Sequence, residues 1–414
     1  MSLDLPNSRD TELLSRARRV VPNGIWGHMA TRSIGPGYPQ FFSRAEGCRV
    51  WDADGNEYVD FMCAWGPNVL GYGHPEVNAA AQAQIAKGDI GNGPTEVMVE
   101  LAELLVDTID HADWTLFQKN GSDATTVCVT IARATTGRRK ILVAKGSYHG
   151  AVPWCSPSMV GVTAEDRAHI VQYTYNDIAS LEAAAAAAGD DLAAVLITAF
   201  KHDVQIDQAL PEADFLARAR ALCDTTGAAL ICDDVRAGFR LNVRGSWTAY
   251  GIKPDLAAYS KSIANGWPLA AVAGAEAFRG GAEKIFTTGS FWYGSAAMAA
   301  AVTTIKLLRD TNALAHTEAM GTLFRDGLYS AARAHGYKLR QTGPVQMPMV
   351  LFDGDQDLRL GNAFCTAALR HGLYMHPRHN LFLCAAHQPS DIEQALDAAS
   401  AAFRDLAAAG LCVE

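Results

Sequence analysis

The sequence lacks the long apolar segments and basic runs that mark membrane-bound and nucleic-acid-binding proteins. No apolar stretch approaches the roughly 20 residues that a membrane-spanning helix needs, and the N-terminal segment has no apolar core of a signal peptide. Lysine and arginine never gather in a dense run, and the formal net charge is −9 at pH 7. Because nucleic acids and anionic membranes attract basic patches, neither is expected as a partner. We therefore expect a soluble cytoplasmic protein.

Cysteine is present, but not in the spacing of a disulfide framework or a zinc site. The nine cysteines are odd in number, scattered along the chain and never arranged as Cys-X-X-Cys. Such thiols are typical of the buried, reduced cysteines of a cytoplasmic protein. We expect no structural disulfide and no bound metal.

The chain is long enough for a large α/β domain and a smaller one. Its 414 residues include 49% hydrophobic residues, enough to form an extensive core. Strand and helix patterns alternate through residues 116–259, which predicts a mainly parallel sheet with helices on both faces. The two chain ends are expected to form one smaller α/β domain. The predicted divisions are 1–60 and 315–414 for the small domain and 61–314 for the large domain.

Several elements of the small domain have local signals. Residues 8–20 have the apolar spacing of an amphipathic helix. Two β-branched runs joined around Asp54-Gly55 predict a β-hairpin. The last helix is expected to begin at Ser390 with a capping box that includes Glu393, and to end at Gly410.

The stretch from residue 228 to residue 273 contains the main chemical signal. A short apolar run, residues 228–232, predicts a buried strand and is followed by Asp233 and Asp234. A second apolar run, residues 256–259, is followed by Ser260 and Lys261. Ligands of open α/β sheets bind at the carboxyl ends of the strands. A lysine for a Schiff base and an aspartate for a pyridinium nitrogen fit pyridoxal phosphate, although each residue alone is more often a cap or a solvated side chain.

Two further strand ends carry suitable residues. Asn120-Gly121-Ser122 stands at the start of a predicted helix, where free backbone N–H groups and a hydroxyl can bind an anion. The alternative is an ordinary helix cap. Tyr148 and His149 follow a predicted strand at residues 140–144; the alternatives are a packed loop residue and a hydrogen-bonded, semi-buried histidine.

Longer segments carry a resemblance to a known family. The relevant segments, in order along the chain, are WDADGNEYVDF, WGPNVLGYGHPEV, NGSDA, TGRRKILVAKGSYHG, CDDVRAGFR, PDLAAYSK and TTGSFWYGSAAMAAA. Together they resemble the class III (ω-type) aminotransferases of fold type I, nearest the glutamate-1-semialdehyde 2,1-aminomutase group. The resemblance covers nearly the whole chain. It implies a transferase that depends on pyridoxal 5′-phosphate, with a large domain built on a mainly parallel sheet of the seven-stranded type, covered by helices, plus a smaller α/β domain.

The resemblance implies roles for four residues around the coenzyme ring. Lys261 would form the Schiff base and move the proton between the substrate carbon and the coenzyme. Asp233 would keep the pyridine nitrogen protonated, so that the ring accepts electrons. Tyr148 would stack on one face of the ring, and Val235 would pack against the other.

Four more residues would bind the coenzyme phosphate. Gly121 and Ser122 would hold it with backbone amides and a hydroxyl. Gly289 and Ser290 would reach the phosphate of the neighbouring subunit. A homodimer with shared active sites is therefore expected.

The sequence departs from the family pattern where substrate is bound. The aminomutase arginine that holds the substrate carboxylate falls on Ala30, with Arg32 two residues on. Residues 198–202 read Thr-Ala-Phe-Lys-His where most members have Glu-Pro, and residues 292–295 read Trp-Tyr-Gly-Ser in place of Ser-Gly-Asn-Pro. Glutamate-1-semialdehyde is therefore not expected as the substrate.

Candidates for substrate contact lie in the predicted small domain and next to it. Arg378 could bind a carboxylate in bidentate fashion, or be a surface residue. Trp65 resembles the family's pocket tryptophan, with a core role as the alternative. His28 and Trp26 lie in a loop that should border the entrance.

Three functions are compatible with these residues. The first is an aminotransferase that works through a pyridoxamine phosphate intermediate, with a small-molecule amino acid or amine donor and a keto or aldehyde acceptor. The alternative is an isomerase, either an aminomutase or a racemase, which would share every coenzyme residue. A non-catalytic coenzyme-binding protein is disfavoured because Lys261 is present.

Overall fold

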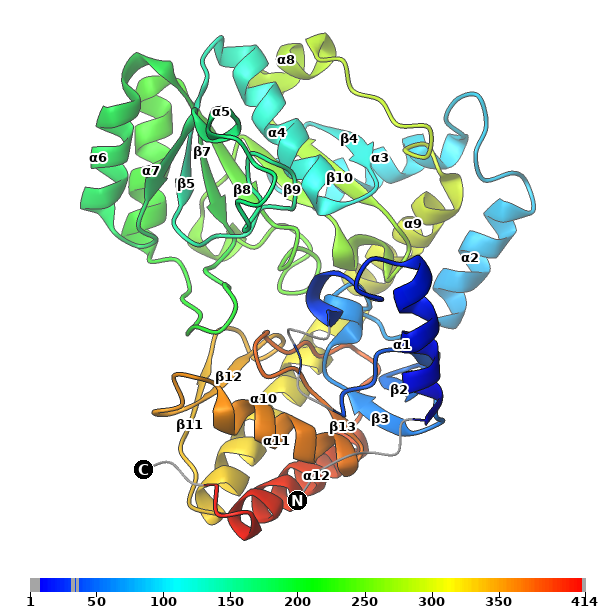
Figure 1. Cartoon of the computed structure of the whole chain (residues 1–414). Coiled ribbons are helices and arrows are strands. Elements are labelled where there is room, and N and C mark those ends of the chain that lie inside the picture. Colours follow the sequence, from blue (N-terminus) through cyan, green and yellow to red (C-terminus); the bar gives the residue numbers. More distant parts are fainter. Residues whose placement is uncertain (1–7, 31–33, 35–36, 412–414) are drawn as a thin grey trace. The chain divides into compact units, whose positions relative to one another are not determined.

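The computed structural model describes residues 8–30, 34 and 37–411, which form two compact units (Figure 1). Unit 1 contains the described residues up to His74, residues 204–207 and the described residues from Ala315 onward. Unit 2 contains residues 75–203 and 208–314. The first division was expected at residue 60, but an antiparallel bridge between Gly47 and Tyr72 keeps the next residues with the hairpin.

Unit 2 is built on a seven-stranded sheet, in which the strand order is β4-β10-β9-β8-β7-β5-β6. Only β10 runs antiparallel to its neighbours. The expectation of a mainly parallel, seven-stranded sheet is therefore confirmed. The strands are β4 (Trp114–Gln118), β5 (Lys140–Ala144), β6 (Ile170–Tyr173), β7 (Leu192–Thr198), β8 (Ala229–Asp233), β9 (Leu256–Tyr259) and β10 (Ala270–Gly274).

The central strands are apolar at every position because helices cover both faces of the sheet. All seven residues of β7 are buried, which is typical of a parallel strand packed on two sides. Helix α4 (Gly121–Thr136) packs on one face against alternate strand residues such as Leu196 and Ile231. The residues between them point to the other face, where α6 (Ile178–Ala188) and α7 (Ala213–Thr226) contact β5 to β8 (Figure 1).

Two helices of unit 2 pack against α9, and the start of α4 is fixed by a cap. The Asn120 side chain accepts a hydrogen bond from the Asp123 N–H at 3.0 Å, and Gly137 ends the helix at φ 70°. Helices α2 and α3 pack against α9. The other helices are α2 (Pro75–Ile85), α3 (Glu96–Thr108), α5 (Ala164–Arg167), α8 (Arg279–Lys284) and α9 (Ser295–Asp310).

Unit 1 combines strands from both ends of the chain. Its four-stranded sheet has the order β1-β2-β3-β13, and the C-terminal strand β13 runs parallel to β3. A separate pair, β11 and β12, is antiparallel. The strands are β1 (Phe42–Glu46), β2 (Arg49–Asp52), β3 (Glu57–Asp60), β11 (Leu339–Thr342), β12 (Met349–Phe352) and β13 (Leu373–Tyr374).

The helices of unit 1 confirm one local prediction and correct another. Helix α1 (Ser8–Val20) has the expected bounds. Helix α12 (Pro389–Ala408) begins one residue earlier than expected, and its capping box pairs Gln388 with Asp391 rather than Ser390 with Glu393. Pro389 explains the shift, because proline is favoured in the first turn of a helix. The other two helices are α10 (Ala313–Ala334) and α11 (Arg359–Arg370).

None of the helices in the described part of the chain combines the length and the apolar character that crossing a membrane requires.

Candidate active site

Six strands of unit 2 end at one edge of the sheet, and most of the candidate residues follow these ends. Strands β4 to β9 are parallel, so their carboxyl ends point the same way. The register pairs Asp233, the last residue of β8, with Thr198 of β7 and Ala258 of β9. Lys261 comes three residues after Ala258. The acid and the lysine therefore leave the sheet from neighbouring strands at the same edge.

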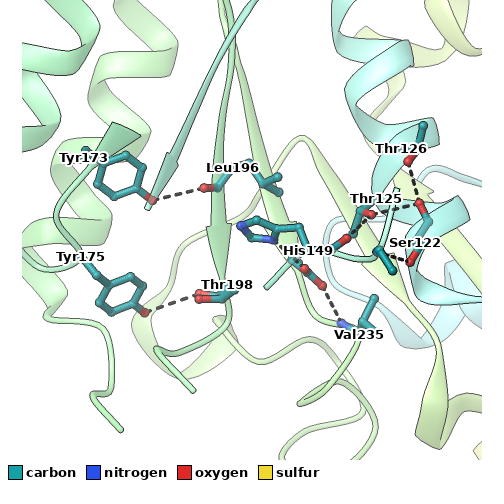
Figure 2. Close-up of polar contacts among 11 residues, drawn as sticks. Ser122, Thr125, Thr126, His149, Tyr173, Tyr175, Leu196, Thr198 and Val235 are labelled. Carbon is teal, nitrogen blue, oxygen red and sulfur yellow. Dashed lines mark hydrogen bonds and ion pairs between the residues drawn. The ribbon is translucent and has the colours of Figure 1, made fainter. Parts of the chain in front are cut away.

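Asp233 is buried and is held by two hydrogen bonds. Its Oδ2 atom lies 2.7 Å from His149 Nδ1, and its Oδ1 atom accepts a bond from the Val235 N–H at 3.2 Å. His149 is only 2% exposed. Charge-assisted contacts of this kind fix the orientation of a carboxylate. Figure 2 shows His149 at the tip of the sheet, with Val235 beside it.

Lys261 begins a 3₁₀ turn, Lys261–Ala264, in a strained backbone conformation with φ 45°. Burial lowers the pKa of its amine to about 7, and the positive charges of Arg236 and Arg240 act in the same direction, while Asp233 opposes them. A buried ammonium is unfavourable, and like charges make it more so. The amine of Lys261 is therefore mostly uncharged at pH values slightly above 7.

The start of α4 is joined to the loop that carries His149. Ser122 Oγ accepts a hydrogen bond from the Ala151 N–H at 3.1 Å. Figure 2 shows the second link, in which Thr125 Oγ1 donates to the His149 carbonyl at 2.7 Å. A Cβ atom at Gly121 would lie 2.6 Å from Val235 Cγ1. Glycine is therefore required where the helix start approaches Val235. The arrangement leaves a helix N-terminus beside the Asp233 site, a suitable place for an anion.

The two remaining candidates for contact with the coenzyme ring are Val235 and Tyr148. Val235 is partly buried and packs against the core of unit 2. Tyr148 is 38% exposed, and burial of the rest of the ring raises its hydroxyl pKa. Asp234 is oriented differently from Asp233: its two oxygens accept bonds from the Ser246 N–H at 3.0 Å and from Ser246 Oγ at 2.6 Å. Burial raises the pKa of Asp234 to about 6.

Gly289 and Ser290 lie in a surface loop of unit 2. The Gly289 carbonyl accepts a bond from the Trp292 N–H at 2.9 Å, and a Cβ atom at Gly289 would lie 2.3 Å from Trp292 Nε1. Ser290 is exposed. Phe286 and Phe291 in the same loop are 94% and 66% exposed.

Unit 1 brings Trp65 together with two histidines. The Trp65 ring contacts His376 and His379 edge to face, with centroid distances of 5.2 and 5.1 Å. The backbone of Trp65 has φ 69°, at the end of a left-handed turn that starts at Cys63. The Arg378 N–H donates to His376 Nδ1 at 3.1 Å. Trp65 therefore belongs to a cluster of rings, and the two histidines of this cluster lie on either side of Arg378 in the sequence.

The N-terminal candidates are less enclosed. Trp26 is 77% exposed. His28 lies in a 3₁₀ turn, Gly27–Met29, and its side chain is outside the described part of the structure. Ala30, at the aminomutase arginine position, is buried, and Arg32 is outside the described residues.

Sequence reasoning missed several participants. It noted His149 but gave it no role, and it did not select Arg236, whose Nη1 atom donates to the His202 carbonyl at 2.9 Å. It also passed over His376 and His379, which flank Arg378. The position of His149 next to Tyr148, at a strand end, was an available signal. Nothing in the sequence indicates that Arg236 and His202 are in contact.

Comparisons with known proteins give one consistent result. The family model of the class III aminotransferases matches residues 33–402. An aminopentol aminotransferase from Sphingopyxis macrogoltabida is 50% identical over 396 residues, which cover 96% of this chain and 94% of that protein. A glutamate-1-semialdehyde 2,1-aminomutase from Desulforamulus reducens is 31% identical over 429 residues, covering 96% and 98%. The solved structure of the Sphingopyxis sp. MTA144 FumI protein in its pyridoxal phosphate internal aldimine form has a TM-score of 0.97 at 48% identity, covering 99% of each chain.

Proposed function

The chain belongs to the class III aminotransferase family and is a pyridoxal phosphate-dependent enzyme, and on this premise we propose that it takes the amino group of an amine of the aminopentol kind. The acceptor is a keto or aldehyde compound. The 50% identity to the aminopentol aminotransferase extends over almost the whole of both chains, which supports this donor class. One observation supports the catalytic residues above all: Asp233 and Lys261 follow neighbouring parallel strands at the same edge of the sheet.

The residues at this edge fit the coenzyme. Unit 2 has a helix start where a Cβ atom at Gly121 would collide with Val235, a buried carboxylate at Asp233, and a half-buried lysine, Lys261, whose amine pKa is lowered to about 7. When bound, pyridoxal phosphate supplies an aldehyde that reacts with amines and a ring that takes up electrons from the reacting carbon. These three features match its phosphate, its ring nitrogen and its aldehyde.

We propose that Lys261 is the residue that reacts with the coenzyme and then moves a proton. Its lowered pKa makes the amine available near neutrality, both as a nucleophile and as a base. The strained φ of 45° is compatible with a functional position, because strained residues concentrate at such sites.

We propose that Asp233 faces the ring nitrogen and holds a proton there. His149 and the Val235 N–H fix its two oxygens, so the carboxylate does not have to reorient when the coenzyme enters. Tyr148 and Val235 would flank the ring. His149 is a positioning residue, because it acts through Asp233.

We propose that Gly121 and Ser122 bind the phosphate, with Gly289 and Ser290 reaching the phosphate of a second subunit. The helix start at Asn120 supports the first pair. The exposed Phe286 and Phe291 in the second loop support a homodimer, since large exposed apolar side chains commonly mark interfaces.

The proposed location is the cytoplasm. Eight of the nine cysteines lie in the described ranges, and all eight are free and buried, as expected for a reducing compartment. No nucleic-acid or membrane partner is proposed.

Unit 1 supplies the proposed substrate contacts. Trp65 and Arg378 are the main candidates, and Trp26 and His28 are the secondary ones. The clustered rings around Trp65 can contact the apolar part of a substrate, and the Arg378 guanidinium can bind an anionic group.

The test follows the coenzyme spectrum of the purified protein. We expect a yellow protein whose absorbance band changes when an aminopentol-type amine is added, and returns when a keto acid follows. A colourless protein that takes up no pyridoxal phosphate would contradict the proposal. A protein that reacts with amino acids but not with amines would contradict only the donor class.

An isomerase is the second candidate, because one relative at 31% identity is a glutamate-1-semialdehyde aminomutase. The buried Ala30 at the position of the aminomutase arginine disfavours that substrate. Candidate substrates incubated without any keto acceptor distinguish the two activities. Sustained turnover under these conditions would favour the isomerase.

A further inference from the structure

Arg236 is a buried arginine that has no role among the coenzyme contacts proposed above. It directly follows Val235 and is only 7% exposed. Its Nη1 atom donates to the His202 carbonyl at 2.9 Å. A buried guanidinium is costly unless anionic or strongly polar groups surround it. Its presence at the catalytic edge of the sheet therefore needs a reason.

The acidic groups around Arg236 do not compensate for its burial. Asp233, Asp203 and Tyr148 all favour the charged guanidinium, yet burial still lowers the pKa of Arg236 to about 10. Asp233 has already accepted bonds from His149 and from the Val235 N–H. With a pKa of about 10 the guanidinium stays charged at neutral pH, as an anchor for a carboxylate requires.

Arg236 also acts on the reactive amine. After burial itself, its charge is the largest influence that lowers the pKa of Lys261. Two cations close together in a buried site repel each other, and an anion that binds near both relieves the repulsion. A ligand at Arg236 would thus lie close to the atom where amino transfer takes place.

The segment beside Arg236 contains a buried polar atom with no partner. His202 is 4% exposed, and its Nδ1 atom has no hydrogen-bond partner within the described residues. Buried polar atoms without partners are uncommon in native proteins and can mark a ligand position. This segment is also the one whose sequence departs from the Glu-Pro of most family members. Residues 198–202, where the sequence differs from the family pattern, and Arg236 therefore belong to one local structure.

We propose that Arg236 binds the carboxylate of a 2-keto acid that accepts the amino group, and so determines the acceptor class. In a 2-keto acid the carboxylate carbon is bonded directly to the reacting carbonyl carbon, so its anchor must lie close to Lys261. The planar guanidinium matches a carboxylate in bidentate geometry. The inference rests on the proposed function, in which the donor has no carboxylate. Arg236 therefore acts on the acceptor half of the reaction.

The first experiment compares two acceptors in single turnovers. The pyridoxamine phosphate form of the enzyme is mixed with pyruvate or with propanal, which lacks the carboxylate. In Arg236→Met the ratio of kcat/KM for pyruvate to that for propanal should fall about 100-fold, as expected for loss of a bidentate charged contact. Arg236→Lys keeps the charge but loses the fork, and its ratio should fall about tenfold.

The matched control is Arg218→Met, which also removes an arginine from unit 2. Arg218 is exposed and pairs with Glu182 at 2.6 Å on the helical surface. The ratio of the two acceptors should not change in this variant. Coenzyme absorbance, measured for every variant, reports whether the site has folded.

The second experiment measures binding without turnover. Propionate and propionamide are titrated into the holoenzyme while the coenzyme absorbance is followed. In Arg236→Met the affinity for propionate should fall at least about tenfold, whereas the affinity for propionamide should stay unchanged.

Two results would overturn the inference. An unchanged pyruvate-to-propanal ratio in both Arg236 variants would place the carboxylate elsewhere. An equal loss for both acceptors, with unchanged propionate binding, would assign Arg236 to the coenzyme or to the fold. Failure of the wild-type protein to take up coenzyme would instead overturn the proposed function.

Discussion

Unit 2 and unit 1 place their candidate residues by different structural means. In unit 2, Asp233, His149 and Lys261 follow the carboxyl ends of parallel strands, so the topology of the sheet brings them together. In unit 1, Trp65 lies in a left-handed turn and His376 in a loop after a two-residue strand. A sheet edge is rigid, whereas turns and loops tolerate substitution. The candidate residues of unit 2 are therefore fixed by the sheet, whereas those of unit 1 depend on turns and loops.

The two units also differ in charge. The site in unit 2 combines three ionisable groups, Asp233, Arg236 and Lys261; the charge of Arg236 lowers the pKa of Lys261, and the charge of Asp233 acts in the opposite direction. In unit 1, Trp65 contacts imidazole rings. Buried charges interact strongly because water is excluded. Substitutions in unit 2 should therefore have larger effects than those in unit 1, and the following predictions test that order.

The largest effect is expected for Lys261→Ala. Turnover should fall about 10⁴-fold, because the variant lacks both the amine that reacts with the coenzyme and the proton carrier. Borohydride reduction of the wild-type holoenzyme followed by peptide mapping should locate the coenzyme on Lys261. Lys145→Ala, a change at an exposed lysine of the same unit, is the control. Label on any other lysine would contradict the assignment.

The next largest effect is expected for Asp233→Ala. Loss of the carboxylate that faces the ring nitrogen should reduce kcat about 10³-fold, within the range seen when a preorganised electrostatic contact is removed. Stopped-flow spectroscopy of the amine half-reaction measures this loss. Asp190→Ala removes an exposed aspartate of unit 2 and serves as the comparison. If the two variants behave alike, Asp233 has no catalytic role.

His149→Phe should have an intermediate effect. Without the 2.7 Å contact to Asp233 the carboxylate is less well oriented, and kcat should fall about 100-fold. The wavelength of the bound coenzyme should also shift, a change that a purely structural role would not produce. His149→Asn retains a donor and should recover part of the activity. A lower kcat with an unchanged spectrum would argue against positioning through Asp233.

The uptake of coenzyme should depend on pH through Lys261. Its pKa lies at about 7 instead of the ordinary 10.5, so the reactive neutral amine is lost as the pH falls through 7. Below that point the uptake rate of the coenzyme-free protein should fall about tenfold per pH unit, and above it the rate should level off. A midpoint above pH 9 would contradict a lowered pKa.

The same pKa predicts a trend in stability. Between pH 7 and 10.5 the unfolded chain binds a proton at Lys261 that the folded, coenzyme-free protein does not. The contribution of this residue to the free energy of unfolding therefore rises with pH across that window. Chemical denaturation of wild type and Lys261→Met at several pH values measures the difference. A parallel pH dependence in both proteins would contradict it.

The smallest effect is expected in unit 1, for Arg378→Met. If this half-buried arginine contacts substrate, the KM of the substrate that it binds should rise about tenfold at most, as for loss of one charged contact. The coenzyme spectrum should be unchanged. Trp65→Ala provides a second test, because it should raise the KM of large apolar donors more than the KM of small donors. Loss of coenzyme from either variant would remove the distinction between the two units.

Much of unit 2 could be predicted from local patterns. Apolar runs of four to seven residues correspond to strands β7, β8 and β9, and the residues after them correspond to the sheet edge. This worked because buried parallel strands need continuous apolar sequence. The cap at Asn120 was visible for a similar reason: cap chemistry is decided within a few residues.

Contacts between distant segments could not be predicted in the same way. The pairing of His149 with Asp233 joins residues 84 positions apart, and Arg236 meets His202 across 34 positions. Helix α12 shows the same limit on a smaller scale, since its cap formed at Gln388 next to Pro389 and not at the sequence-matched Ser390. Several residues of suitable type compete for such roles, and only the packed structure selects among them.

The sequence alone determined the alternation of strands and helices, the family, and the pair formed by an acid and a lysine at successive strand ends. These properties depend on local periodicity and on the order of motifs, which the chain carries directly. The tertiary structure decided which groups surround that pair: His149 against Asp233, and Arg236 near enough to Lys261 to lower its pKa. The physical reason is that burial and charge interaction depend on distance in space, and separation along the chain does not specify that distance.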